Sequence, residues 1–162
     1  MTYLLDANVF IQAKNLQYGL DFCPAFWDWL ILQNAAEKVF SIDKVEDELS
    51  AGADELTTWA QKQPNLFRKT DSNAIAQFGD ISQWVTSQSY EQAAISNFFQ
   101  VADFYLIAHA LAENYVVVTH EIPANSFKRI KIPNVCAGLK LQFMTPYEML
   151  RREQARFILG IK

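Results

Sequence analysis

Residues 102–119 read ADFYLIAHALAENYVVVT, an alanine-rich segment followed directly by a β-branched run. Alanine and leucine favour helices, whereas valine and threonine favour strands. The run from Tyr115 to Thr119 is apolar without alternation, which indicates a strand that is buried on both faces. A helix that leads straight into such a strand predicts an α/β fold with a parallel sheet.

Short apolar runs elsewhere predict further strands of this sheet. They lie at residues 3–5, 39–42 and 141–144. Helical segments are predicted between them at residues 24–38, at 53–63 and at 72–99, the last one broken near 87–90. Thr145 and Pro146 suit the cap and first position of a final helix that reaches about Ala155.

Composition limits the class of protein. With 162 residues, 51% of them hydrophobic and 20% charged, the chain is predicted to form one domain over residues 1–162. It has no apolar run of about eighteen residues and no basic, cleavable leader, so we expect a cytoplasmic protein without a membrane span. Cys23 and Cys136 have no metal-ligand spacing and are predicted to be buried free thiols. The net charge of −4 predicts that any nucleic-acid site is local.

Acidic residues follow the predicted strands. Asp6 ends the first strand, an acidic run from Asp43 to Glu48 follows the second, and Glu121 lies just beyond Thr119. Ligands of parallel sheets bind beyond the carboxyl ends of the strands, so these side chains are expected to share one crevice. Asp103 opens a helix that is otherwise almost entirely apolar, which makes it either a cap or a buried acid with a partner.

The simpler interpretation of each acid is structural. Asp6 or Asp103 alone is a common type of helix cap, Asp43 with Glu46 fits a capping pair, and the acidic run could be a solvated face. Their coincidence at strand ends favours a joint role. Clustered carboxylates repel one another and take up protons unless a divalent cation neutralises them, and oxygen ligands suit Mg²⁺ or Mn²⁺.

The order of these motifs resembles that of the PIN-domain nucleases. The four matching stretches are Leu4 to Ile11 around Asp6, Glu48-Leu-Ser-Ala-Gly, Ala102 to Ala108 around Asp103, and Val117 to Glu121. The resemblance implies a three-layer α/β/α fold with a central parallel sheet and Mg²⁺- or Mn²⁺-dependent hydrolysis of RNA. It also implies a toxin like VapC, with a protein antitoxin as partner and a homodimeric state.

The resemblance selects six catalytic residues. Asp6 and Asp103 are expected to bind the metal directly, and Glu48 and Glu121 to bind it through water, hold a second cation or orient the nucleophile. Asn8 and Thr119 are expected to support these acids by hydrogen bonds.

The sequence departs from the family pattern at two positions. Ala7 stands where Thr or Ser is common, which removes a hydroxyl that could orient the first acid. Glu121 replaces the commoner Asp and is longer by one methylene.

Basic and imidazole side chains complete the set of candidates. We expect Lys44, Lys128, Arg129 and Lys131 to cluster around the acidic crevice and to contact phosphates, although the segment 127–131 could also be a solvated loop. His109 is expected to be a packed core residue, and His120 an exposed surface residue.

Two other functions compete with the nuclease. A haloacid-dehalogenase-like phosphatase also begins with a strand-end Asp, but it needs a second acid at the position of Asn8. A catalytically weak PIN-like module that only binds RNA or protein is the non-enzymatic alternative. Retention of four costly carboxylates argues against that module.

Overall fold

The central sheet explains where the functional residues meet. The computed structural model describes residues 1–160, and its five strands are all parallel in the order β3-β2-β1-β4-β5. The strands are β1 (Tyr3–Leu5), β2 (Val39–Ile42), β3 (Phe67–Arg68), β4 (Val116–Val118) and β5 (Phe143–Met144). The predicted parallel sheet is therefore confirmed.

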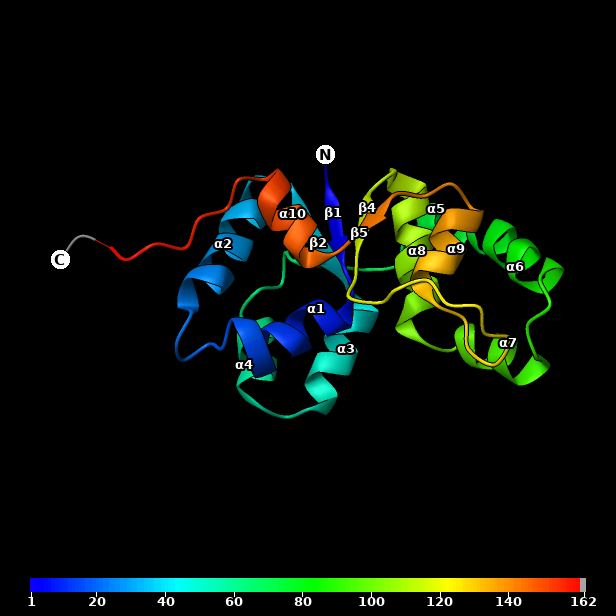
Figure 1. Cartoon of the computed structure of the whole chain (residues 1–162), viewed down its shortest axis with the longest axis horizontal. Helices are drawn as coiled ribbons and strands as arrows, with labels where there is room; N and C mark the ends of the chain where they lie inside the picture. The colour runs from blue at the N-terminus through cyan, green and yellow to red at the C-terminus, as the bar shows by residue number, and fades with distance from the viewer. Residues whose placement is uncertain (161–162) are drawn as a thin grey trace.

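Helices cover both faces of the sheet and form a three-layer α/β/α arrangement (Figure 1). In Figure 1, α2 and α10 lie on one side of the strands, and α5, α6, α8 and α9 lie on the other. The helices are α1 (Ala7–Gln12), the π-helix η1 (Ala13–Gln17), α2 (Pro24–Ala35), α3 (Asp43–Ala51), α4 (Glu55–Gln61), α5 (Ser72–Ile75), α6 (Phe78–Ser87), α7 (Gln92–Phe98), α8 (Ala102–Glu113), α9 (Ile132–Gly138) and α10 (Pro146–Arg152).

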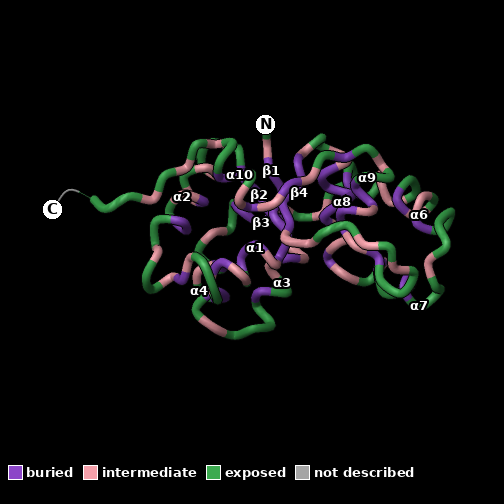
Figure 2. The backbone as a smooth tube through the Cα atoms, viewed as in Figure 1, coloured by how far each residue is buried: buried purple, intermediate pink, exposed green. Residues whose placement is uncertain are grey.

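The core is built on the inner strands. Every residue of β1, β2 and β4 is buried, as the continuous apolar runs predict (Figure 2). Helix α8 packs on this sheet and buries most of its length, including His109. Within residues 1–160, no helix combines the length and apolar character that crossing a membrane requires.

Most predicted elements are present, with differences at their ends. Helix α2 ends at Ala35 and not at residue 38, because Glu37 adopts a left-handed φ of 59° before β2 begins. The predicted helical region 72–99 breaks at residues 88–91, as expected, and also at residues 76–77. Thr145 caps α10 by accepting a hydrogen bond from the Glu148 N–H, and that helix ends at Arg152.

The strand order places a topological switch point between β1 and β4. From β1 the chain builds outward through β2 and β3, and it then returns to the other side of β1 to form β4 and β5. Parallel sheets bind ligands at such a point, outside the carboxyl ends of the strands. Leu5 pairs with Val118 in the register, so the next residues, Asp6 and Thr119, meet at this position.

Candidate active site

Thr119 is the centre of a hydrogen-bond network at the switch point. The Thr119 hydroxyl donates a hydrogen bond to Asp6 Oδ2 at 2.9 Å. Thr119 Oγ1 also accepts hydrogen bonds from Asn8 Nδ2 at 3.2 Å and from the Glu121 N–H at 3.1 Å. Asn8 Oδ1 in turn accepts from the His120 N–H at 3.2 Å. Thr119 is almost fully buried, so it fixes the junction of β1 and β4 with all its hydrogen-bonding capacity in use.

The network also replaces the hydroxyl that Ala7 lacks. Asp6 caps α1, and its Oδ1 accepts from the Ala7 N–H at 2.7 Å while Thr119 holds Oδ2. Both carboxylate oxygens are therefore oriented, one by a backbone donor and one by a side chain from a different strand. Asp6 is therefore both a helix cap and a residue of the candidate site.

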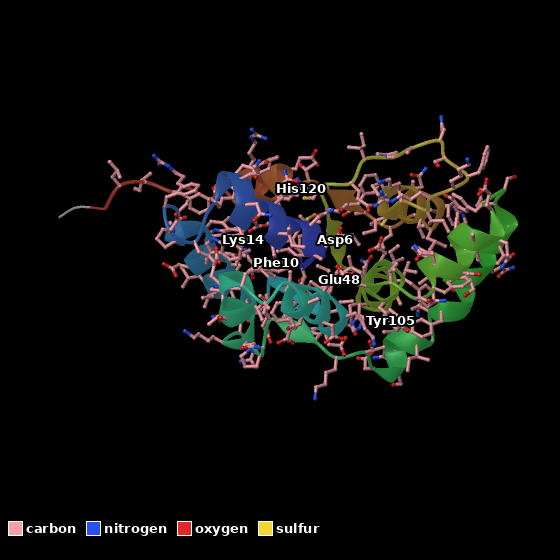
Figure 3. The ribbon with its side chains drawn as sticks, turned by 90° about the horizontal axis from the view of Figure 1, so that it is seen from below. Asp6, Phe10, Lys14, Glu48, Tyr105 and His120 are labelled. Carbon is pink, nitrogen blue, oxygen red and sulfur yellow. The ribbon has the colours of Figure 1, made fainter. Side chains whose placement is uncertain are left out.

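The other three acids approach from separate elements. Glu48 lies on α3, Asp103 lies in the first turn of α8, and Glu121 follows β4. All three line one pocket of about 760 Å³ together with Asp6 and Asn8. Figure 3 shows Asp6 at the start of α1 and Glu48 on the neighbouring α3. The structure thus brings together the four acids that the sequence selected.

Two structural expectations for these acids are wrong. Asp103 is not a cap, because the N-cap of α8 is Val101. Asp43 and Glu46 do not form a capping pair either. Ile42 is the N-cap of α3, and the Asp43 side chain accepts a hydrogen bond from the adjacent Lys44 N–H.

Burial and like charge make this cluster hold protons. Desolvation, aided by the charges of Asp103 and Glu121, raises the pKa of Asp6 to about 8, against the lowering effect of the Thr119 hydroxyl. Desolvation and the charges of Glu121 and Glu48 raise the pKa of Asp103 to about 7, partly offset by Arg129. Partial desolvation also raises the pKa of Glu48. Carboxyl groups with such values bind either a proton or a cation near neutral pH.

The donor chemistry fits a hard divalent cation. Every acidic group at the pocket offers carboxylate oxygen, the ligand that Mg²⁺ and Mn²⁺ prefer. Within residues 1–160, no three Asp, Glu, His or Cys side chains form a ready-made ligand set. Desolvation is the largest cause of the raised pKa of both Asp6 and Asp103, so their ionised forms would gain strongly from a bound cation.

Glu121 has a second attachment. Its Oε2 accepts a hydrogen bond of 2.8 Å from the Ile132 N–H, the first residue of α9. An acid at the start of a helix is favoured both by the free N–H groups and by the helix dipole. Glu121 therefore connects the end of β4 to the start of α9, across the loop that carries the basic residues.

Half of the predicted basic cluster is at the pocket. Lys128 and Arg129 line it, next to the acids. Lys44 instead lies over the ring of Tyr105, 5.1 Å from its centroid, and Lys131 is the N-cap residue of α9.

The histidines and cysteines are placed outside the pocket lining. His109 is buried, with Nε2 3.4 Å from Thr70 Oγ1, as predicted for a core residue. His120 is half-buried and not exposed, because its ring packs edge-on against Tyr147 at 5.6 Å. Both cysteines are free, but only Cys136 is fully buried.

Residues 3–157 match the model of a family described as "Domain of unknown function (DUF4411)". The chain belongs to this family. The DUF4411 chain is also similar to a solved structure described as VapBC2 from Rickettsia felis bound to a DNA fragment from their promoter. The TM-score is 0.57 at 14% identity, over 90% of this chain and 98% of that one. Comparison with curated proteins finds no match. The PIN-like fold expected from the sequence is confirmed.

Proposed function

We propose that this chain is a Mg²⁺- or Mn²⁺-dependent endoribonuclease that hydrolyses RNA phosphodiester bonds. The observation that carries the proposal is the pair Asp6 and Asp103, both desolvated and both with a strongly raised pKa, at the switch point of a parallel sheet. Strongly shifted carboxyls in a pocket are typical of functional sites.

Each residue has a defined part in this reaction. Asp6 and Asp103 would hold the cation, and Glu48 and Glu121 would bind metal-bound water or orient it. When bound, a divalent cation supplies a water of lowered pKa and neutralises charge on the phosphoryl oxygens. Thr119 and Asn8 keep Asp6 in place through their shared hydrogen bonds. Lys128 and Arg129, at the same pocket, supply positive charge for the substrate phosphates.

The phosphatase alternative is less well supported by this geometry. The Asn8 side chain, which occupies the position of the second acid, is bound to Thr119 through Nδ2 and to the His120 N–H through Oδ1. It is held as a structural support and has no acidic group to donate a proton to a leaving group.

Biologically, we propose a toxin that is neutralised by a protein antitoxin. The fold shared with the VapBC2 structure supports this part. We also propose that it forms a homodimer and acts in the cytoplasm. Induced expression should arrest bacterial growth, and Asp103→Ala or a co-expressed neighbouring gene should relieve the arrest.

Cleavage of RNA with and without metal tests the enzyme. The purified protein should cleave RNA with Mn²⁺ or Mg²⁺, and EDTA should stop it. Asp6→Asn should be inactive, whereas the exposed Asp28→Asn on α2 is a matched control that should retain the wild-type rate. Cleavage that survives both EDTA and Asp6→Asn would refute the proposal.

A further inference from the structure

The pocket extends well beyond the carboxylates. Its volume of about 760 Å³ falls within the range of about 300–1,000 Å³ that is usual for ligand sites. A single water takes only about 30 Å³ of liquid volume, so a cation and its waters leave most of the space free. The remaining wall is formed by α1 with η1 and by α7, through Ile11, Gln12, Asn15, Leu16, Asn97 and Phe98.

One part of this wall is a π-helix. After Gln12 the helix widens, and the Tyr18 N–H bonds the Ala13 carbonyl five residues earlier, at 2.8 Å. Ala13 points into the core, and Lys14 forms an ion pair with Asp54 at the start of α4 (Figure 3 shows Lys14 on this segment). Short π segments are rare and are frequently found at functional sites.

The π-helix presents a polar side chain, Asn15, and an apolar one, Leu16, to the pocket. Asn15 is exposed there, and Leu16 is 62% exposed beside Ile11 at 40%. The amides of Asn15, Gln12 and Asn97 make no side-chain hydrogen bond within residues 1–160, in contrast to Asn8, whose amide makes two. An amide carries a donor beside an acceptor, which is the pairing presented by the edge of a nucleobase.

The pocket therefore has three chemically distinct sides. Carboxylates lie at the sheet end, Lys128 and Arg129 lie on the loop side, and amides with apolar groups lie on the η1 and α7 side. An RNA strand has three matching parts. The reacting phosphate would lie at the carboxylates, the neighbouring phosphates at the basic residues, and a base at the amides and apolar groups. Bases of single-stranded RNA are recognised by hydrogen bonds to their edges and by packing on their faces.

We propose that η1 selects the nucleotide next to the scissile phosphate, with Asn15 reading the base edge and Leu16 packing on the base face. This inference rests on the proposed ribonuclease function and names the residues that give it sequence preference. Asn15 is a specificity residue and takes no part in the chemical step.

The test compares Asn15→Ala and Leu16→Ala with Gln17→Ala. Gln17 belongs to the same π-helix and is exposed, but it does not line this pocket, so it is the matched control. Cleavage is measured on an RNA pool that contains every trinucleotide. Binding is measured by fluorescence anisotropy of four oligoribonucleotides that differ at one base, with Asp103→Asn introduced into every variant so that the RNA stays intact.

The wild type and Gln17→Ala should prefer one base at one position. Asn15→Ala should reduce this preference by about tenfold or more, as loss of a base-edge contact does. Leu16→Ala should weaken binding of all four oligonucleotides while keeping their order. An unchanged preference in Asn15→Ala overturns the proposal, and so does RNA binding that is insensitive to both changes, because η1 would then not contact the RNA.

The two proposals fail differently. If the wild type does not cleave RNA but still discriminates between the oligonucleotides in an Asn15-dependent way, the nuclease proposal fails and with it the position next to a scissile phosphate, whereas base recognition by Asn15 is supported. If the wild type cleaves RNA without any base preference, the recognition proposal fails and the nuclease proposal stands.

Discussion

Replacing Asp6 by Asn should slightly lower the free energy of unfolding at low pH and raise it at high pH. Burial raises the pKa of Asp6 to about 8 in the folded protein, whereas an unfolded Asp titrates near about 3.9. Between these values the folded state keeps a proton that the unfolded state has released. Stability from this group is therefore greatest at low pH and falls as the pH rises toward the folded pKa.

The magnitude follows from the span of that window. Each pH unit between the two pKa values costs about 1.4 kcal/mol, so the stability contributed by Asp6 should fall by at most about 4 kcal/mol between about pH 5 and about pH 8. Asp103, whose pKa is also raised, adds its own loss in wild type and variant alike. The Asn variant has no loss from position 6. It does lose the bond from Thr119 to Oδ2, which is worth about 1 kcal/mol.

Urea unfolding in EDTA at the two pH values measures the difference. At about pH 5 the variant should be within about 1 kcal/mol of the wild type, and at about pH 8 it should be more stable by about 2–3 kcal/mol. Asp28→Asn, an exposed carboxyl on α2, should follow the wild type at both values. A variant that is destabilised equally at both pH values would show that Asp6 is ionised in the folded protein and would refute the reasoning.

Three further predictions concern the support, the second acid and the basic loop. Thr119→Val keeps the shape of the side chain but removes the hydroxyl that bonds three partners. The free energy of unfolding, measured by chemical denaturation, should fall by about 2–3 kcal/mol, and an unchanged midpoint would contradict the network. Glu48→Gln should lower the cleavage rate about a hundredfold with little change in melting temperature, whereas Glu46→Gln, which caps nothing, should change neither; the opposite result would move the second acid to Glu46. Lys128→Ala with Arg129→Ala should weaken RNA binding and reduce its log–log salt dependence by about one for each lost phosphate contact, and an unchanged salt slope would place the phosphates elsewhere.

The inner strands and their acids could be predicted because local sequence determines them. A continuous β-branched run such as Val116 to Val118 has few alternatives to a buried strand. The acid that follows a parallel strand then lies at the ligand-binding edge of the sheet. Asp6 and Glu121 could therefore be assigned to one crevice without knowledge of any contact.

The elements that were missed depend on distant residues. The strand Phe67–Arg68 has only two residues, and its pairing with β2 alone defines it. Helix α9 has no side-chain cap of its own, because the carboxylate bonded to its first N–H comes from Glu121, eleven residues upstream. Pro133 in its first turn was the one local signal of its start.

The π-helix and the capping of α3 show the same limit. Nothing in residues 13–17 distinguishes a π-helix from an α-helix, and the ion pair to Asp54 depends on the tertiary fold. The pair Asp43 and Glu46 has the spacing of a capping box, but α3 follows β2 directly with Ile42 as its N-cap, so the helix begins one residue earlier than a box capped by Asp43 would require.

The length of the Glu121 side chain links charge at the site to the position of the loop. Its carboxylate lies in the field of Asp6 and Asp103 and also holds the backbone of Ile132, where the basic loop ends. Asn134 on α9 binds Ala124 of the same loop through two hydrogen bonds of 3.0 Å. One side chain, longer than an aspartate by a methylene, thus contributes to the acid cluster and anchors the segment that bears Lys128 and Arg129, so a substitution at this position changes both properties together.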